Sequence, residues 1–285
     1  MDDFYAPLLQ RVSGAFRDAL HELIDDRVSI SHDDTVGVLQ VADRVPLTPS
    51  LVLDLYSAKT FQAVPPAGGR RSWDREHAWP DSHGFDDAIE SGQCNVPLTD
   101  VHILFVADPS TNRNQHVDRY YDDGPGCPPV GGLDGDVNRR CVASFEVWRE
   151  RRGDVARAMF YADVRYDGGP NEAPITNTRR FAGPRDAAGH CIEPDLVLTD
   201  RIEAITPTLT VSGTAYMGVL RTLLRWHFED PVDARDRQHN EAVADKQSNR
   251  NPFIDHPDWA CKVWPEEPPC LDRRYAFLPS VSSTP

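Results

Sequence analysis

A strand–loop–strand–helix pattern constrains the fold of this chain more than any other feature of the sequence. Residues 71–77 fit a strand, residues 81–98 are rich in loop-forming residues, and the apolar run 100–106 fits a second strand or a buried segment. Asp108 and Pro109 then make a helix start, with a capping side chain followed by proline at the first helical position. This order of elements indicates an α+β fold class.

Glu76 and His77 stand at the end of the first predicted strand and carry the most informative chemistry of the chain. A carboxylate can hold a hard divalent cation, and a neutral imidazole can take a proton from water near physiological pH. Consecutive residues of a regular strand point to opposite faces, so the two can serve one phosphodiester only where the strand ends or bulges. Pro80 favours such an irregular exit.

Asn112 lies in the first turn of the predicted helix, where its side chain can reach over the strand ends. An asparagine and a carboxylate are hard oxygen donors, which suit Mg²⁺ or Ca²⁺ better than zinc. Because His77 must be neutral to accept a proton, we expect activity to fall as the pH drops below about 6.5.

Composition limits the classes of protein that the chain can belong to. The 285 residues are 40% hydrophobic, which is enough for a substantial core in one domain or two small ones. The net charge of −15 argues against a protein that coats nucleic acid in general, because such a protein should be basic. Arginine clusters at 70–71, 139–140 and 149–152 suit phosphate contacts, although solvated surface charge is the simpler interpretation of any one cluster.

The six cysteines include no C-x-x-C pair, so a structural zinc site is not expected. Their even number and loop context favour disulfides, with Cys127–Cys141 and Cys261–Cys270 preferred because they are close in sequence. Disulfides indicate an oxidising compartment. The first residues lack the pattern of a signal peptide, which leaves a cytoplasmic protein and a removed presequence both open. No window is apolar enough for a membrane span.

The rest of the chain is predicted from hydrophobic spacing and from helix-capping and loop-forming residues. The expected elements are helices at 5–25, 49–57, 153–164, 215–228 and 231–247, loops at 119–141 and 167–195, a turn-rich segment at 249–257 and a loose tail at 266–285.

Four blocks of sequence resemble the endonuclease I family, secreted and periplasmic nucleases with a ββα-metal (His-Me finger) core. The blocks are residues 73–80, 99–112, 152–161 and 224–257, and they occur in the order of the family. The resemblance is strongest over residues 70–260. It implies a single endonuclease I-like domain across 1–285, secreted or periplasmic, with a ββα-metal core surrounded by helices and long loops.

The resemblance also implies the roles of the residues at the matching positions. His77 would be the general base that activates water, and Glu76 and Asn112 would hold one Mg²⁺, with Mn²⁺ or Ca²⁺ as alternatives in binding. The substrates would be double- and single-stranded DNA, with RNA as a further substrate, cut with little sequence preference. The products would carry 5′-phosphate and 3′-hydroxyl ends. The resemblance implies no membrane partner and no particular oligomeric state.

Several other residues are candidates for binding phosphate or for supporting the site. In the family an arginine commonly lies three residues after the metal-binding asparagine, but here that position is Gln115. The change leaves open an alternative function, a nucleic-acid-binding protein of the same fold with weakened catalysis. Asp100 and His102 either orient His77 or form a structural hydrogen bond between elements. The candidates are Arg75, Asp100, His102, Arg113, Arg119 and Arg250.

Overall fold

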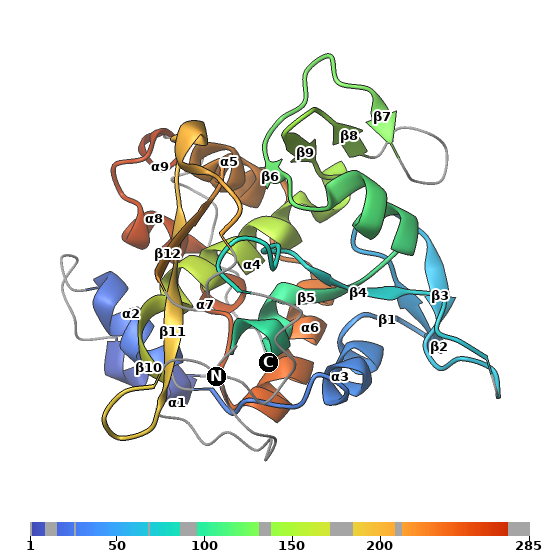
Figure 1. The fold of residues 1–285 in the computed structure, drawn as a ribbon, viewed down its shortest axis with the longest axis horizontal. Coiled ribbons are helices and arrows are strands. Elements are labelled where there is room, and N and C mark those ends of the chain that lie inside the picture. Colours follow the sequence, from blue (N-terminus) through green and yellow to red (C-terminus); the bar gives the residue numbers. More distant parts are fainter. Residues whose placement is uncertain are drawn as a thin grey trace.

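One long buried helix, α4 (Arg152–Arg165), lies at the centre of the protein in the computed structural model (Figure 1). The sheet β10–β11–β12 lies on one side of it and the sheet β1–β2–β3 on the other. The described residues contain several helices and small sheets, which confirms the predicted α+β class. The structure describes residues 2–8, 16–25, 27–67, 69–85, 96–130, 138–171, 185–208 and 213–272.

The elements run in the following order. The helices are α1 (Asp2–Tyr5), η1 (Ala6–Leu8), α2 (Phe16–Ile24), α3 (Asp34–Ala42), η3 (Pro97–Thr99), η4 (Val101–Ile103), η5 (Thr111–His116), η6 (Arg149–Arg151), α4, η7 (Ile202–Ala204), α5 (Leu220–Glu229), α6 (Ala234–Gln247), α7 (Pro252–Asp255), η8 (Pro257–Trp259), α8 (Ala260–Val263) and α9 (Pro268–Leu271). The strands are β1 (Arg44–Val45), β2 (Thr48–Leu53), β3 (Thr60–Gln62), β4 (Asp74–His77), β5 (Leu104–Ala107), β6 (Tyr120–Tyr121), β7 (Pro129–Val130), β8 (Asn138–Arg140), β9 (Ser144–Glu146), β10 (Asp167–Asn171), β11 (Cys191–Leu198) and β12 (Gly213–Met217).

The sheets of the described residues are small and mostly antiparallel. β1, β2 and β3 form an antiparallel sheet, and β4 pairs with β5 in a separate two-stranded ribbon. β11 pairs with β10 antiparallel and with β12 in parallel. The fourth sheet has the order β6–β9–β8–β7.

Helix α4 confirms the helix predicted at 153–164 and packs against α2, α5, α7 and β11. Gly153 lets α4 approach the end of α5, because a β-carbon there would lie 2.0 Å from the carbonyl oxygen of Asp230. The Gly153 N–H donates to the Asp230 carboxylate at 2.8 Å. The helix predicted at 231–247 starts at Ala234, because its cap is Asp233, which forms a capping box with Asp236.

Four of the predicted elements differ from the structure because tertiary pairing overrides local preference. Residues 49–57 do not form a helix: β2 covers most of this stretch and pairs with β1 and β3. The predicted loop at 167–195 contains β10 and the start of β11, and the predicted loop at 119–141 contains β6, β7 and β8. The predicted helix at 215–228 starts only at Leu220, because the preceding residues form β12.

Both predicted disulfides, Cys127–Cys141 and Cys261–Cys270, are confirmed. Cys191 is also disulfide-bonded. The second bridge joins α8 to α9, so the predicted loose tail starts later than residue 266. Residues 273–285 of that tail and residues 9–15 of the first predicted helix lie outside the described residues. Among the residues that the structure covers, none of the helices has the length and apolar character needed to cross a bilayer.

His102 and His227 are fully buried and are held in the neutral form. Burial lowers the pKa of His102 to about 4, and burial with the Arg157 charge lowers the pKa of His227 to about 3. His227 Nε2 lies 2.9 Å from the Pro257 carbonyl and donates to it. The folded-state pKa values of both histidines lie below the unfolded-state pKa of about 6.5. The stability that the neutral rings contribute is therefore fully present above pH 6.5 or so. It is lost as the pH falls toward the folded-state values.

We expect His227→Gln to flatten the acid side of the stability profile. Glutamine can keep an N–H donor for the Pro257 carbonyl, but it does not titrate. The free energy of unfolding of the parent should fall by up to about 1.4 kcal/mol per pH unit for each such histidine below pH 6.5 or so. Urea denaturation between about pH 8 and about pH 4 measures this slope. His190→Gln, at a half-exposed histidine, is the control. Equal slopes for His227→Gln and the parent would contradict the assignment.

Candidate active site

The predicted strand–strand–helix unit is present as β4, β5 and the helix that contains η5. β4 and β5 are antiparallel, with Glu76 opposite Phe105 and His77 opposite Leu104. The Asp108 carboxylate accepts the backbone N–H groups of Ser110 and Thr111 at 2.8 and 3.2 Å, which confirms the helix start.

The helix then widens into a π-helix over Thr111–His116, in which the Val117 N–H bonds to the Asn112 carbonyl at 3.0 Å. Such π segments are rare in regular helices and are frequent at functional sites. Here the widened turns carry Asn112 and His116 beside β4.

His77 is the last residue of β4, so the strand ends where the sequence required it to end. Its Nε2 lies 3.0 Å from the Leu98 carbonyl oxygen. A carbonyl can only accept, so the hydrogen of the neutral ring is on Nε2 and the lone pair is on Nδ1. The ring also makes an edge contact with Phe85, with centroids 5.3 Å apart. His77 is therefore half-buried and fixed in orientation, with one basic nitrogen left for chemistry.

Glu76 points to the opposite face of β4 and is buried in a cluster with Tyr56, His116 and Tyr121. Its Oε1 accepts from the Tyr56 hydroxyl at 2.7 Å and from His116 Nδ1 at 2.6 Å. The Tyr121 hydroxyl lies 3.1 Å from that of Tyr56, and the Tyr121 ring stacks on His116. Burial and the Glu76 charge raise the pKa of Tyr56 well above the ordinary tyrosine value, so Tyr56 stays a hydrogen-bond donor.

Asn112 and Glu76 fit the donor set that a hard cation requires. Asn112 Nδ2 donates to the Arg75 carbonyl at 3.3 Å, so its Oδ1 is the atom left for a cation. Both contacts on Glu76 use Oε1, which leaves Oε2. Within the described part of the chain, there is no group of three or more His, Cys, Asp or Glu side chains that could hold a metal ion. In a site of one carboxylate and one amide oxygen, water and phosphate would be the other ligands of the cation, as is usual for Mg²⁺.

Asp100 and His102 do not lie on a strand as predicted: the strand starts at Leu104, and the two residues belong to the turn of η4. Asp100 is fully buried and forms an ion pair with Arg27 at 3.2 Å. It accepts from the hydroxyls of Tyr161 and Tyr166 at 2.9 and 2.7 Å. Although burial disfavours its charge, Arg27 and other donors lower the pKa of Asp100 to about 2.

His102 also has a structural contact rather than one to His77. Its Nε2 donates to the Asn249 carbonyl at 3.2 Å. Among the described contacts, neither Asp100 nor His102 hydrogen-bonds to the His77 ring. Of the two interpretations of this pair, the structure favours a tie between elements.

The ion pair of Arg27 and Asp100 nevertheless affects His77 through the backbone. Arg27 also donates to the Val96 carbonyl and to Thr99 Oγ1, the latter at 3.2 Å. These contacts fix the chain on both sides of Leu98, whose carbonyl orients the His77 ring.

The arginine candidates have separate surroundings. Arg113 is exposed and pairs with Asp74 through two bonds of 2.7 and 2.8 Å. Arg119 donates to the carbonyls of Gln115, His116 and Cys141, so it caps the end of η5 and ties it to the disulfide loop.

Arg250 binds Asp255 and Glu241, and so stabilises the turn before α7. Gln115 Oε1 is buried without a hydrogen-bond partner among the described residues. Of the candidates, Arg75 lies on the same face of β4 as His77, because the two are separated by one residue.

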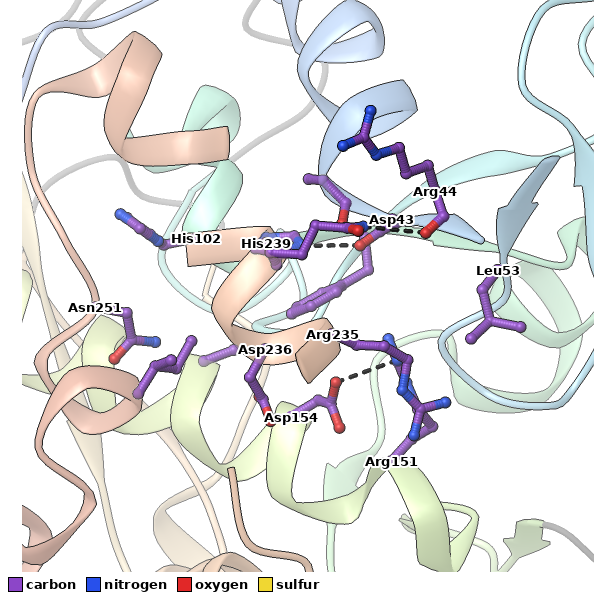
Figure 2. Close-up of a pocket in the computed structure, with 15 residues that line it drawn as sticks. Asp43, Arg44, Leu53, His102, Arg151, Asp154, Arg235, Asp236, His239 and Asn251 are labelled. Atoms are coloured by element: carbon purple, nitrogen blue, oxygen red, sulfur yellow. Dashed lines mark hydrogen bonds and ion pairs between the residues drawn. The ribbon is translucent and has the colours of Figure 1, made fainter. Parts of the chain in front are cut away.

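A polar cavity lies elsewhere, between the end of α3 and the helices α4, α6 and α7 (Figure 2). Asp43 pairs with His239 at 2.8 Å, and Arg151 pairs with Asp154 at 3.2 Å. The space open to the centre of a water molecule is about 20 Å³, which accommodates about one water. The cavity is therefore too small for a nucleotide.

Sequence reasoning missed Tyr56, His116 and the Leu98 carbonyl. His116 follows Asn112 by four residues, and that helical spacing was a signal that it would lie on the same side of the helix. Tyr56 and Leu98 carried no local signal, because they reach the site only through the packing of segments distant in sequence.

Comparison with known proteins agrees with this geometry. The family model for endonuclease I matches residues 14–182 and 205–258. An extracellular ribonuclease of Bacillus amyloliquefaciens is 33% identical over 267 residues, which cover 92% of this chain and 78% of the relative. An extracellular ribonuclease of Bacillus subtilis (strain 168) is 32% identical over 269 residues, covering 93% and 79%.

The unit of β4, β5 and η5 with His77, taken with these matches, defines a hydrolase that acts on nucleic acid. The chain belongs to the endonuclease I family, as its four sequence blocks predicted. The match also extends toward the N-terminus beyond the stretch 70–260 in which the resemblance was strongest.

We expect Arg27→Gln to destabilise the protein by about 3–5 kcal/mol, because it leaves the Asp100 carboxylate buried without its counter-charge. The double variant Arg27→Gln with Asp100→Asn should recover part of this loss, since it removes the unpaired charge as well. Urea denaturation measures the three free energies of unfolding. A single variant as stable as the parent would show that the pair does not hold the segment.

Proposed function

We propose that the protein is a metal-dependent endonuclease of low sequence preference, which hydrolyses phosphodiester bonds to 5′-phosphate and 3′-hydroxyl ends. The observation that carries the proposal is the fixed orientation of His77 at the end of β4, with Nε2 bound to the Leu98 carbonyl and Nδ1 free. Asn112 hydrogen-bonds to the backbone of the same strand, and Glu76 lies next to His77 in sequence. Together these residues support hydrolysis rather than binding alone.

His77 acts as the general base in this mechanism. Its Nδ1 takes a proton from the attacking water, and the ring becomes an imidazolium. The Leu98 carbonyl, 3.0 Å from Nε2, then accepts from a cationic ring, and this stronger hydrogen bond favours the proton transfer. Phe85 packs against the ring and limits the other orientations that it can take.

Glu76 and Asn112 would hold one Mg²⁺ through Oε2 and Oδ1. When bound, the cation would stabilise negative charge on the phosphate and on the leaving 3′ oxygen. Tyr56 and His116 both donate to Glu76 Oε1, so they fix the rotamer of the carboxylate. Mn²⁺ and Ca²⁺ offer the same preference for oxygen ligands and are the alternatives to test.

RNA is the first substrate to test, because both relatives are named extracellular ribonucleases. Double- and single-stranded DNA are the others, since contacts to the backbone rather than to base edges do not by themselves select a sequence. The same names and the disulfides support a secreted protein.

We expect His77→Ala to lower the rate of cleavage by about 10²–10⁴-fold, because it removes the general base. Purified protein would be incubated with plasmid and with RNA, in a panel of Mg²⁺, Mn²⁺ and Ca²⁺ and with EDTA. Cleavage in metal that stops in EDTA and in His77→Ala supports the proposal. His190→Ala, at a half-exposed histidine, is the matched control and should cleave like the parent.

The alternative to an enzyme is a nucleic-acid-binding protein of the same fold with weakened catalysis, and the same experiment decides between the two. Plasmid and RNA that stay intact with every metal, while still binding to the protein, would overturn the proposed hydrolysis and favour the alternative.

We expect Mg²⁺ to raise the melting temperature of the parent, because a ligand that binds only the folded state stabilises it. The shift should disappear in Glu76→Gln and in Asn112→Ala and persist in His77→Ala, since His77 is not a ligand. Thermal unfolding at increasing Mg²⁺ measures this without any cleavage assay. A shift that persists in both Glu76→Gln and Asn112→Ala would place the cation elsewhere.

A further inference from the structure

Arg71 and Arg75 are two half-buried arginines near His77, and neither forms an ion pair with a described residue. The chain has 45 acidic and 30 basic residues, so carboxylates are in surplus. The Asp74 carboxylate, which lies on the same strand, pairs with Arg113 instead. The arginines that do pair include Arg17, Arg27, Arg151, Arg152, Arg157, Arg165 and Arg250. A half-buried guanidinium without a carboxylate in such a chain is a cation available to an external anion.

The loop before α3 completes this group of side chains. Arg75 Nη1 donates to the His32 carbonyl and to Thr35 Oγ1, the latter at 3.1 Å. Arg75 Nη2 lies 3.2 Å from His32 Nδ1. A guanidinium can only donate, so Nδ1 of His32 accepts and the ring hydrogen is on Nε2. His32 is thereby fixed as a neutral donor beside Arg75.

Arg71 reaches the same region from the other end of the strand. Its Nε donates to the Trp73 carbonyl at 2.8 Å, and its guanidinium lies 4.5 Å from the centre of the Trp73 ring. These contacts hold the side chain in place and leave its two terminal amino groups as donors.

The electrostatics of the group fit an anion site. Burial and the Arg75 and His77 charges lower the pKa of His32 to about 4, so it is neutral at physiological pH. Arg71 and Arg75 carry like charges within electrostatic range of each other, and the Asp33 and Asp74 carboxylates compensate them without forming an ion pair with either. A bound phosphate would add a direct counter-charge.

We propose that His32, Arg71 and Arg75 form a subsite for a backbone phosphate of the polynucleotide, next to the phosphate cut at His77. The proposal rests on the proposed function, because it places the subsite on the His77 face of β4. A phosphate held there fixes the position of the polynucleotide relative to His77. It also gives a physical account of Gln115: the positive charge absent from that one position is supplied by β4 and the segment before it, at Arg71 and Arg75.

We expect Arg71→Gln to weaken binding of a short labelled RNA by about tenfold at low salt and to lower the slope of log affinity against log salt by about 0.7. Binding would be measured by fluorescence anisotropy in the His77→Ala background with EDTA, so that no cleavage occurs. Single-stranded DNA should respond in the same way, because the contact is to phosphate. His32→Phe, which removes the Nε2 donor, should also weaken binding.

Arg201→Gln is the matched control, because Arg201 is exposed and makes no ion pair within the described residues. It should bind RNA like the His77→Ala parent. Arg75→Gln is a further variant, and its melting temperature must be recorded because Arg75 also holds the loop before α3. Arg71→Gln with unchanged affinity and unchanged salt slope would overturn the subsite.

The two proposals can fail separately. Loss of affinity in Arg71→Gln, combined with no cleavage by the unmodified protein in any metal, would support the subsite and overturn the hydrolysis. Normal cleavage combined with unchanged binding by Arg71→Gln would overturn the subsite alone.

Discussion

The buried ion pair between Arg27 and Asp100 is the interaction on which the site depends. Both side chains are fully buried, and Asp100 is also held by the hydroxyls of Tyr161 and Tyr166. Burial of a charge is costly unless it is paired and hydrogen-bonded, and here the main partners of Asp100 come from distant parts of the chain. Because Arg27 also binds the segment on both sides of Leu98, the pair sets the position of the carbonyl that orients His77.

The candidate catalytic residue and the candidate metal ligand of β4 lie on opposite faces of this short strand. Alternation along β4 sends Glu76 into a buried cluster and His77 to the opposite face, and both remain near the strand end because β4 stops at His77. The π-helix brings Asn112 to the backbone of the same strand. Arg75 lies on the same face of β4 as His77 rather than with Glu76, so positive charge lies on the face that carries the candidate base.

Local signals were sufficient for those parts of the fold and site that depend on neighbours in sequence. The Asp108 cap, helix α4 and the two short disulfide loops were predicted correctly because each is fixed within a few residues or turns. Prediction failed at β10 and β12, which pair with β11 across intervening segments, and at β2, which pairs with its sequence neighbours β1 and β3. The predicted role of the pair Asp100–His102 failed for a related reason, because its partners come from other elements.

The sequence by itself supplied the candidate groups: a glutamate, a histidine and an asparagine in an order and spacing that a strand and a helix start can bring together. It also determined the family, through blocks that lie in a fixed order. Only the tertiary structure decided which nitrogen of His77 is free, what holds Glu76 and which arginines lack a carboxylate. Those properties depend on contacts from residues 20 to 73 positions away, such as Tyr56 with Glu76 and Arg27 with Asp100, and no local pattern encodes such contacts.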